Sequence, residues 1–135
     1  MPFSYLRTVH FADTDAAGVV FFANYLAMCH EAYEEALGAA GLDLNAFFSA
    51  HALVIPVAKS ETTYLRPLGA GDKVRIVVAP AALTPESFAL NFEIVRLGPS
   101  EKVAAKARTE HVCIDAKSRQ RKALPSDLAA WIALS

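Results

Sequence analysis

The sequence predicts an α+β fold in which one long helix packs on an antiparallel sheet of about five strands. Residues 25–40 carry apolar side chains at steps of three and four, which is typical of a helix. Residues 54–115 alternate with period two and are interrupted by short turns containing glycine or proline, which is typical of successive strands. Because helix and strands are segregated along the chain, we expect one helical layer on one sheet.

The chain has 135 residues, of which 54% are hydrophobic and 20% are charged. These values are those of a globular protein, and without a repeat or linker we expect one domain over residues 1–135. The apolar fraction is high for so small a domain, which indicates burial against further copies of the chain. The formal net charge of −1 gives no reason to expect nucleic acid as a partner.

No apolar run approaches the length of a membrane span, and the first residues do not resemble a signal peptide. We therefore expect a cytoplasmic protein with no membrane partner. The two cysteines have neither metal nor redox spacing and are expected to be buried and free.

The first element is a strand over residues 3–12, one face of which carries apolar and aromatic side chains as far as Phe11. A loop follows from Asp13. Asn24 is the expected N-cap of the long helix, which runs from Tyr25 to Ala40.

A short helix is expected over residues 43–52, with Phe47 and Phe48 facing inward. The strands that follow are expected over residues 54–66, 73–80, 87–97 and 101–115. Because short turns join them, we expect each strand to pair with the next in an antiparallel meander. The C-terminal segment ends in a short helix capped by Ser126 or Asp127.

Two aspartates, Asp13 and Asp15, precede the long helix. Aspartates in loops often only bond to nearby backbone amides, and this structural role stays open for both. Their position beside the apolar run Val-Val-Phe-Phe favours a catalytic role, since partial burial raises the pKa of a carboxyl group and makes it a better base. Unpaired N–H groups at the helix start can stabilise an oxyanion. A carboxylate and an oxyanion site suffice for acyl transfer to water.

No metal ion or other cofactor is expected. His30 lies on the helix, but Glu34 stands where a zinc protease motif needs its second histidine. The remaining histidines are scattered over separate elements: His10, His51 and His111. A glycine-rich phosphate loop and a Gly-x-Ser-x-Gly motif are both absent from the sequence.

Basic residues are concentrated near the C-terminus: Lys102, Lys106, Arg108, Lys117, Arg119, Arg121 and Lys122. Two interpretations stay open, a solvated strand edge and tail, or a binding surface for the phosphates of a nucleotide-like carrier. Interleaved aromatic residues, which single-stranded nucleic acid would require, are absent from this stretch.

The segment FADTDAAGVVFFANYLAMCHEAYEEAL, residues 11–37, resembles the signature segment of the 4-hydroxybenzoyl-CoA thioesterase family of hot-dog proteins. The shared features are Asp-x-Asp, a small-small-Gly turn, an apolar pair and Asn-Tyr. Within the family, MCHEAYE and the HVCI of residues 111–114 are most similar to hydrolases of 1,4-dihydroxy-2-naphthoyl-CoA in cyanobacterial phylloquinone biosynthesis. The resemblance implies a hot-dog fold, in which the sheet wraps around the long helix, and a thioester hydrolase for an aromatic acyl-CoA.

The resemblance also implies roles for single residues. Asp15 would be the catalytic carboxylate, as nucleophile or as general base for water. The backbone amide of Phe22 would polarise the thioester carbonyl, and Asp13 would be a structural neighbour. A thiolate departs readily, so this site needs no triad, metal or redox cofactor.

The family works as dimers or tetramers with active sites between subunits, so the resemblance implies a homotetramer built from dimers. The residues expected to contact the substrate are Phe21, Asn24 and Tyr25 together with Val54, Ile55 and Pro56, the last three contributed by a second subunit.

The chain departs from some relatives at residues 83–86, Leu-Thr-Pro-Glu, where those relatives carry a basic cluster for the CoA phosphates. The CoA contacts therefore do not carry over. Three alternatives stay open: a thioesterase for aliphatic acyl-CoA, a non-catalytic acyl-CoA-binding module, and catalysis by a helix carboxylate, namely Glu31, Glu34 or Glu35.

Overall fold

The computed structural model describes residues 2–48 and 52–135. The helices are the 3-10 turn η1 (Phe11–Asp13), α1 (Phe22–Ala39), α2 (Leu44–Phe48) and α3 (Ser126–Leu134). The strands are β1 (Phe3–Thr8), β2 (Leu53–Val54), β3 (Val57–Tyr64), β4 (Lys73–Thr84), β5 (Ser87–Arg96), β6 (Lys102–Val112) and β7 (Ile114–Asp115). The predicted inward packing of Phe47 and Phe48 and the position of His51 lie outside what the structure describes.

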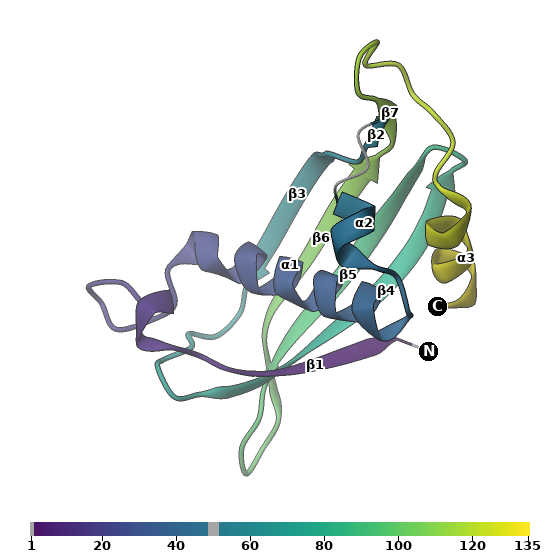
Figure 1. Cartoon of the computed structure of the whole chain (residues 1–135). Coiled ribbons are helices and arrows are strands. Elements are labelled where there is room, and N and C mark those ends of the chain that lie inside the picture. Colours follow the sequence, from purple (N-terminus) through teal and green to yellow (C-terminus); the bar gives the residue numbers. More distant parts are fainter. Residues whose placement is uncertain (1, 49–51) are drawn as a thin grey trace.

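Five strands form one antiparallel sheet in the order β1-β4-β5-β6-β3, and β2 pairs with β7 beside it. The long helix α1 lies across one face of this sheet (Figure 1). The predicted α+β architecture is therefore confirmed, including the number of strands in the main sheet.

The predicted meander is correct only for β4, β5 and β6. The strand β3 pairs with β6 from Val57↔His111 to Tyr64↔Ala105 and does not pair with β4. The prediction that these neighbours in sequence pair with each other is wrong, because β1 occupies the free edge of β4. The consequence is that β3 forms an edge of the sheet, at the opposite side from β1.

Three predicted strands are interrupted or shorter than expected, and the one over residues 101–115 divides into β6 and β7 at Cys113. The segment over residues 54–66 is interrupted at Pro56, whose missing N–H cannot continue a ladder. The first strand ends at Thr8, and Phe11 begins the turn η1 with 86% of its surface exposed, so its predicted place on a strand face is wrong. Local hydrogen bonds from Asp13 N to His10 O replace strand pairing there.

The helix α1 begins at Phe22, three residues before the predicted start. Asn24 is therefore not the N-cap, a position held by Phe21. The Asn24 side chain instead donates to the backbone oxygen of Asp13 at 2.9 Å. The buried stripe of α1 consists of Tyr25, Met28, Cys29, Ala32, Tyr33, Ala36 and Leu37. At the other end of the chain, α3 is preceded by Pro125 as N-cap, not by Ser126 or Asp127.

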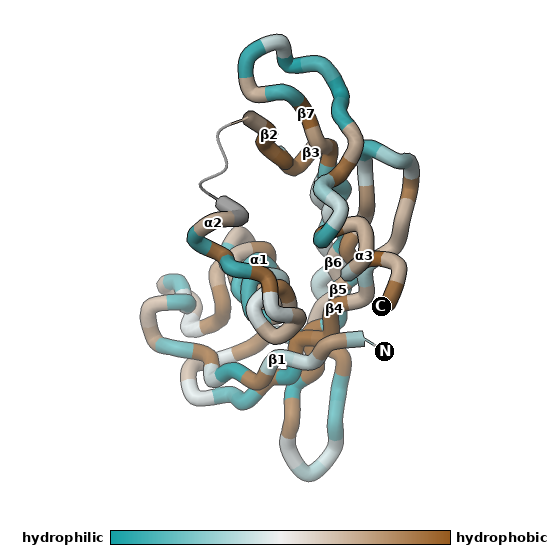
Figure 2. The backbone as a smooth tube through the Cα atoms, turned by 45° about the vertical axis from the view of Figure 1, so that its right-hand side comes forward, coloured by the Kyte–Doolittle hydropathy of each residue, from teal (hydrophilic) through white to brown (hydrophobic). Residues whose placement is uncertain are grey.

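The core lies between α1 and the sheet and continues under α3. Its fully buried members include Leu37, Ile76, Phe88, Leu90 and Leu128. Burial of a side chain of this size contributes about 1.5–3 kcal/mol. Figure 2 shows hydrophobic stretches in the strands beside α1, whereas the loop that follows β7 is largely hydrophilic.

Candidate active site

The loop between β1 and α1 is held in place through Asp13. Arg7 of β1 donates to both carboxylate oxygens of Asp13, at 2.7 and 3.1 Å, and His10 N donates at 2.8 Å. Arg7 holds the pKa of Asp13 below its ordinary value, outweighing the burial that would raise it. Asp13 is thus an ionised carboxylate with its hydrogen bonds satisfied, which is a structural role.

The same guanidinium reaches the helix. Arg7 Nε donates to Glu31 Oε2 at 2.7 Å, and the Arg7 side chain is only 9% exposed. The backbone oxygen of Asp13 accepts from Phe21 N at 3.0 Å and from Asn24. Arg7 therefore joins β1, the loop and α1, the three elements that set the position of the helix start relative to the loop.

Asp15 differs from Asp13 in its exposure and in its hydrogen-bond partners. Its side chain is exposed, and Oδ1 accepts from Ala17 N at 2.9 Å in a turn that Gly18 closes with φ +82°. Oδ2 has no hydrogen-bond partner in the part of the chain that the structure describes. Of the two aspartates, the partly buried one is therefore Asp13, and its pKa is lowered by Arg7 and not raised by burial.

The structure places Asp15 at a cavity of about 420 Å³, the Asp15 cavity, lined by Asp15, Val19, Val20, Phe21, Phe22, Tyr25, Tyr64, Leu65, Arg66 and Pro67. Phe22 is the first residue of α1, and its N–H has no partner among the described residues, as expected at a helix start. The cavity is thus lined by one residue with a carboxylate oxygen that has no partner and by another whose backbone N–H has none among the described residues. Asn24 does not line the cavity, since its amide bonds to Asp13.

Aromatic contacts shape the wall of the Asp15 cavity. The rings of Tyr25 and Tyr64 meet edge to face with centroids 5.0 Å apart, and Tyr64 OH donates to Phe22 O at 3.1 Å. Arg66, which the sequence reasoning did not select, also lines the cavity and donates to Val103 O at 2.9 Å. A tyrosine of β3 therefore supports the first turn of α1.

Val54 and Ile55 line a different cavity of about 580 Å³, the Val54 cavity, and Pro56 lines neither. Within one chain, the predicted acyl-pocket residues are therefore not brought to Asp15. The Val54 cavity shares four lining residues with a third cavity: His30, Tyr33, Val57 and His111.

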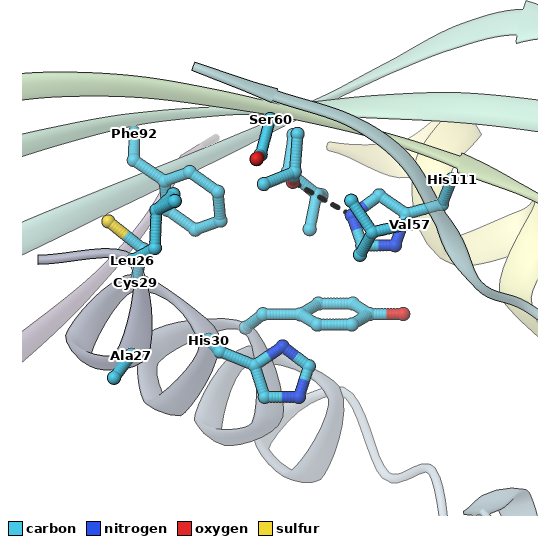
Figure 3. Close-up of a pocket in the computed structure, with 11 residues that line it drawn as sticks. Leu26, Ala27, Cys29, His30, Val57, Ser60, Phe92 and His111 are labelled. Carbon is cyan, nitrogen blue, oxygen red and sulfur yellow. Dashed lines mark hydrogen bonds between the residues drawn. The ribbon is translucent and has the colours of Figure 1, made fainter. Parts of the chain in front are cut away.

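This third cavity, the His111 cavity, has a volume of about 310 Å³ and lies between α1 and the strands β3 and β6 (Figure 3). Thr109 Oγ1 and His111 Nε2 are 2.8 Å apart at its wall. The His111 ring is 3% exposed and stacks on Phe88 with centroids 4.7 Å apart. Burial lowers the pKa of His111 to about 4, so the ring is neutral near pH 7.

Sequence reasoning missed this pair, although period-two alternation along β6 places Thr109 and His111 on one face. The helix carboxylates considered as alternatives lie elsewhere. Glu31 pairs with Arg7, Glu34 lies 3.4 Å from His30, and neither these two nor Glu35 lines any of the three cavities.

The basic residues near the C-terminus are mostly exposed. Lys106 and Arg108 lie within ion-pair distance of Glu93 and Glu110, at 3.9 and 3.3 Å. Among residues 2–48 and 52–135, His, Cys, Asp and Glu side chains form no group of three that could hold a metal ion. The helices in the same ranges are all too short or too polar to cross a membrane.

Comparison with known proteins adds the family. The sequence model of the thioesterase-like superfamily matches residues 9–132. A 1,4-dihydroxy-2-naphthoyl-CoA hydrolase of Thermosynechococcus vestitus is 46% identical over 128 residues, which are 95% of this chain and 86% of that protein. The enzyme of the same name from Nostoc punctiforme is 46% identical over 132 residues, 98% of this chain and 87% of that protein.

Among solved structures, a 1,4-dihydroxy-2-naphthoyl-CoA thioesterase from Synechocystis superposes with a TM-score of 0.93 at 33% identity, covering 98% of this chain and 96% of the other. The predicted hot-dog thioesterase is thereby confirmed. The chain belongs to the thioesterase-like superfamily.

Proposed function

We propose that this protein hydrolyses 1,4-dihydroxy-2-naphthoyl-CoA to 1,4-dihydroxy-2-naphthoate and CoA. The observation that supports the proposal is the Asp15 cavity, which is lined by both Asp15 and Phe22; one carboxylate oxygen of Asp15 and the N–H of Phe22 have no partner among the described residues. The relatives of that name that align over nearly the whole chain support the substrate.

The reaction needs two groups. The thioester carbonyl accepts a hydrogen bond from Phe22 N–H, which stabilises the negative charge that develops on its oxygen. Asp15 either attacks the carbonyl carbon directly or removes a proton from the attacking water. The C–S bond then breaks, CoA leaves as a thiolate that takes up a proton, and water supplies the carboxylate oxygen of the product.

The walls of the cavity favour an aromatic acyl group over an aliphatic one. Tyr25 and Tyr64 offer ring faces and edges close to the carboxylate, and Phe21 and Phe22 are exposed beside them. Flat rings pack on such surfaces with both hydrophobic and quadrupole contributions.

We further propose that the active site forms between two subunits. The edge strand β3 is exposed along nearly its whole length. In a two-fold symmetric antiparallel pair centred on β3, Val57 lies opposite the partner's Tyr64. Such pairing brings the Val54 cavity of one subunit to the Asp15 cavity of the other. It also covers exposed apolar side chains, among them Phe22, Val54, Val57, Tyr64 and Leu65.

Two such dimers would form the homotetramer expected from the family. A cytoplasmic location agrees with the two free, buried cysteines, since free thiols persist in a reducing compartment.

Thiol release from a panel of acyl-CoA esters tests the function. We expect the highest kcat/KM for 1,4-dihydroxy-2-naphthoyl-CoA, a lower value for benzoyl-CoA, and the lowest for acetyl-CoA and butyryl-CoA. Faster hydrolysis of the aliphatic esters would favour the aliphatic thioesterase. Binding without release of thiol from any ester would favour the non-catalytic module.

Subunit mixing tests the shared site. Asp15→Asn removes the carboxylate, and Val54→Trp fills the Val54 cavity, so each variant is expected to be inactive alone. Refolding them together leaves one intact site in each mixed dimer, and about a quarter of wild-type activity should return. A mixture that stays inactive, beside a control of Asp15→Asn refolded with wild type that keeps its activity, would show that both groups act within one chain.

A further inference from the structure

The His111 cavity has no part in the chemistry described so far, yet it is built like a ligand site. Its floor is α1 with Leu26 and Cys29, and its roof is the sheet, from which Phe92 and the Ser60 hydroxyl point inward (Figure 3). Apolar walls with a few convergent polar groups are typical of small-molecule sites.

We propose that the His111 cavity binds the ring of the acyl group, and that Thr109 and His111 together recognise the ring hydroxyl remote from the thioester, on ring carbon 4. This inference rests on the proposed function and deepens it, because it names the feature of the substrate that the protein selects.

The chemistry of the pair suits a phenol. When Thr109 donates to His111 Nε2, the imidazole carries its proton on Nδ1 and the threonine oxygen still accepts. When Nε2–H donates to Thr109, the threonine hydroxyl donates onward and Nδ1 accepts. In both tautomers the threonine oxygen keeps one free hydrogen-bonding function, an acceptor in the first and a donor in the second, and His111 holds it in place. A phenol hydroxyl, which can donate or accept, fits Thr109 in either case.

The pair is also held rigidly. His111 stacks on Phe88 with an angle of 7° between the rings and lies 5.4 Å from the ring of Tyr33. It is neutral near pH 7, so it does not select an anionic ring substituent. An acyl group that lacks the hydroxyl leaves this buried polar pair without a hydrogen-bond partner. Because an unpaired buried polar group is costly, the site should discriminate strongly against such an acyl group.

The position of the cavity agrees with a site shared between subunits. Within one chain, the two cavities are lined by adjacent residues of α1, Tyr25 and Leu26, but on β3 their lining residues Ser60 and Tyr64 are about 13 Å apart. In the β3 pair described above, Val57, whose ladder partner is His111, faces the partner's Tyr64. The His111 cavity of one subunit therefore lies beside the Asp15 cavity of the other.

Two substrates that differ in a single hydroxyl test the inference: 1,4-dihydroxy-2-naphthoyl-CoA and 1-hydroxy-2-naphthoyl-CoA. Thr109→Val keeps the size and the strand preference of residue 109 but removes its hydroxyl. We expect it to lower kcat/KM for the dihydroxy ester by about tenfold and to change the value for the monohydroxy ester by less than about twofold. His111→Phe, which keeps a flat ring on Phe88, should act in the same direction.

Thr8→Val is the matched control, since it removes a threonine hydroxyl bound by Lys73 at the opposite edge of the sheet. It should leave the ratio of the two kcat/KM values unchanged. Dissociation constants of both esters for the Asp15→Asn variant, with and without Thr109→Val, separate recognition from chemistry and should show the same selective loss. Equal losses for the two esters, or none, would overturn the inference and leave the function standing. Failure of the wild type to hydrolyse either ester would overturn the proposed function itself.

Discussion

Asp13 and Asp15 stand two residues apart in one loop, yet their surroundings are opposite. Asp13 is 16% exposed and accepts hydrogen bonds from Arg7 and His10 N, whereas Asp15 is exposed with one oxygen unengaged. The comparison shows that burial alone does not make a reactive carboxylate, because a buried partner cation lowers the pKa that burial would raise. The satisfied aspartate positions the loop and the unsatisfied one faces the cavity.

The largest loss of activity is expected when Asp15 is replaced. Asp15→Asn should lower kcat by about a thousandfold or more, because the amide is neither a nucleophile nor a base. Its Tm should stay within about 2 °C of the wild-type value, since Asp15 makes one exposed hydrogen bond. Thiol-release kinetics and thermal unfolding measure the two quantities. A variant that retains most of its turnover would remove Asp15 from the mechanism.

Replacing Arg7 tests the structural role of Asp13, the carboxylate that Arg7 binds. Arg7→Gln leaves Asp13 buried without a counter-charge and should lower the free energy of unfolding by about 2–3 kcal/mol. Because Arg7 also ties the loop to α1, kcat should fall by about tenfold with KM nearly unchanged. Urea unfolding and steady-state kinetics at neutral pH check both expectations. Arg7→Lys, which keeps the charge, should restore part of the stability but less of kcat, since it cannot bind Asp13 and Glu31 in the same geometry.

The pH dependence of stability distinguishes Asp13 from the buried histidine. His111 has a pKa lowered from 6.5 to about 4, so between these values the unfolded chain binds a proton that the folded chain does not. Stability is therefore expected to fall as the pH drops from 6.5 toward 4. The contribution of Asp13, whose pKa lies below 3.8, is present above that value and is lost as the pH falls further.

Urea unfolding between pH 3 and pH 7 measures the two steps. The variant His111→Phe should flatten the step between pH 6.5 and 4, and Asp13→Asn should flatten only the more acidic one. An unchanged slope in His111→Phe would show that the histidine is solvated in the folded protein.

The smallest effect is expected for Glu31→Gln. Glu31 shares Arg7 with Asp13 but is 42% exposed, so its loss should cost less than about 1 kcal/mol and change kcat by less than about twofold. Activity and Tm measured beside Asp15→Asn provide the comparison. A collapse of turnover in Glu31→Gln with an active Asp15→Asn would assign catalysis to the helix carboxylate.

Predictions from local patterns were the most successful. The long helix follows from the spacing of its apolar residues, and β5 and the start of β4 at Lys73 follow from their alternation. The strand β4 continues to Thr84, four residues beyond its predicted end at Pro80. Errors arose where a distant contact overrides the local signal. Asn24 has the chemistry of an N-cap, but the oxygen of Asp13 takes its amide, and the helix begins earlier at Phe22.

The sequence by itself determined the fold class and the loop that carries Asp15 ahead of the long helix, because short-range spacing encodes these features. Only the tertiary structure decided which aspartate is partly buried, because the packing of β1 against α1 holds Arg7 between Asp13 and Glu31, and Arg7 and Glu31 lie 24 positions apart in the chain. It also decided that β3 is an edge strand and that Thr109 and His111 line a cavity between α1 and the sheet. Such features depend on which distant segments pack together, and this packing cannot be predicted from local sequence patterns.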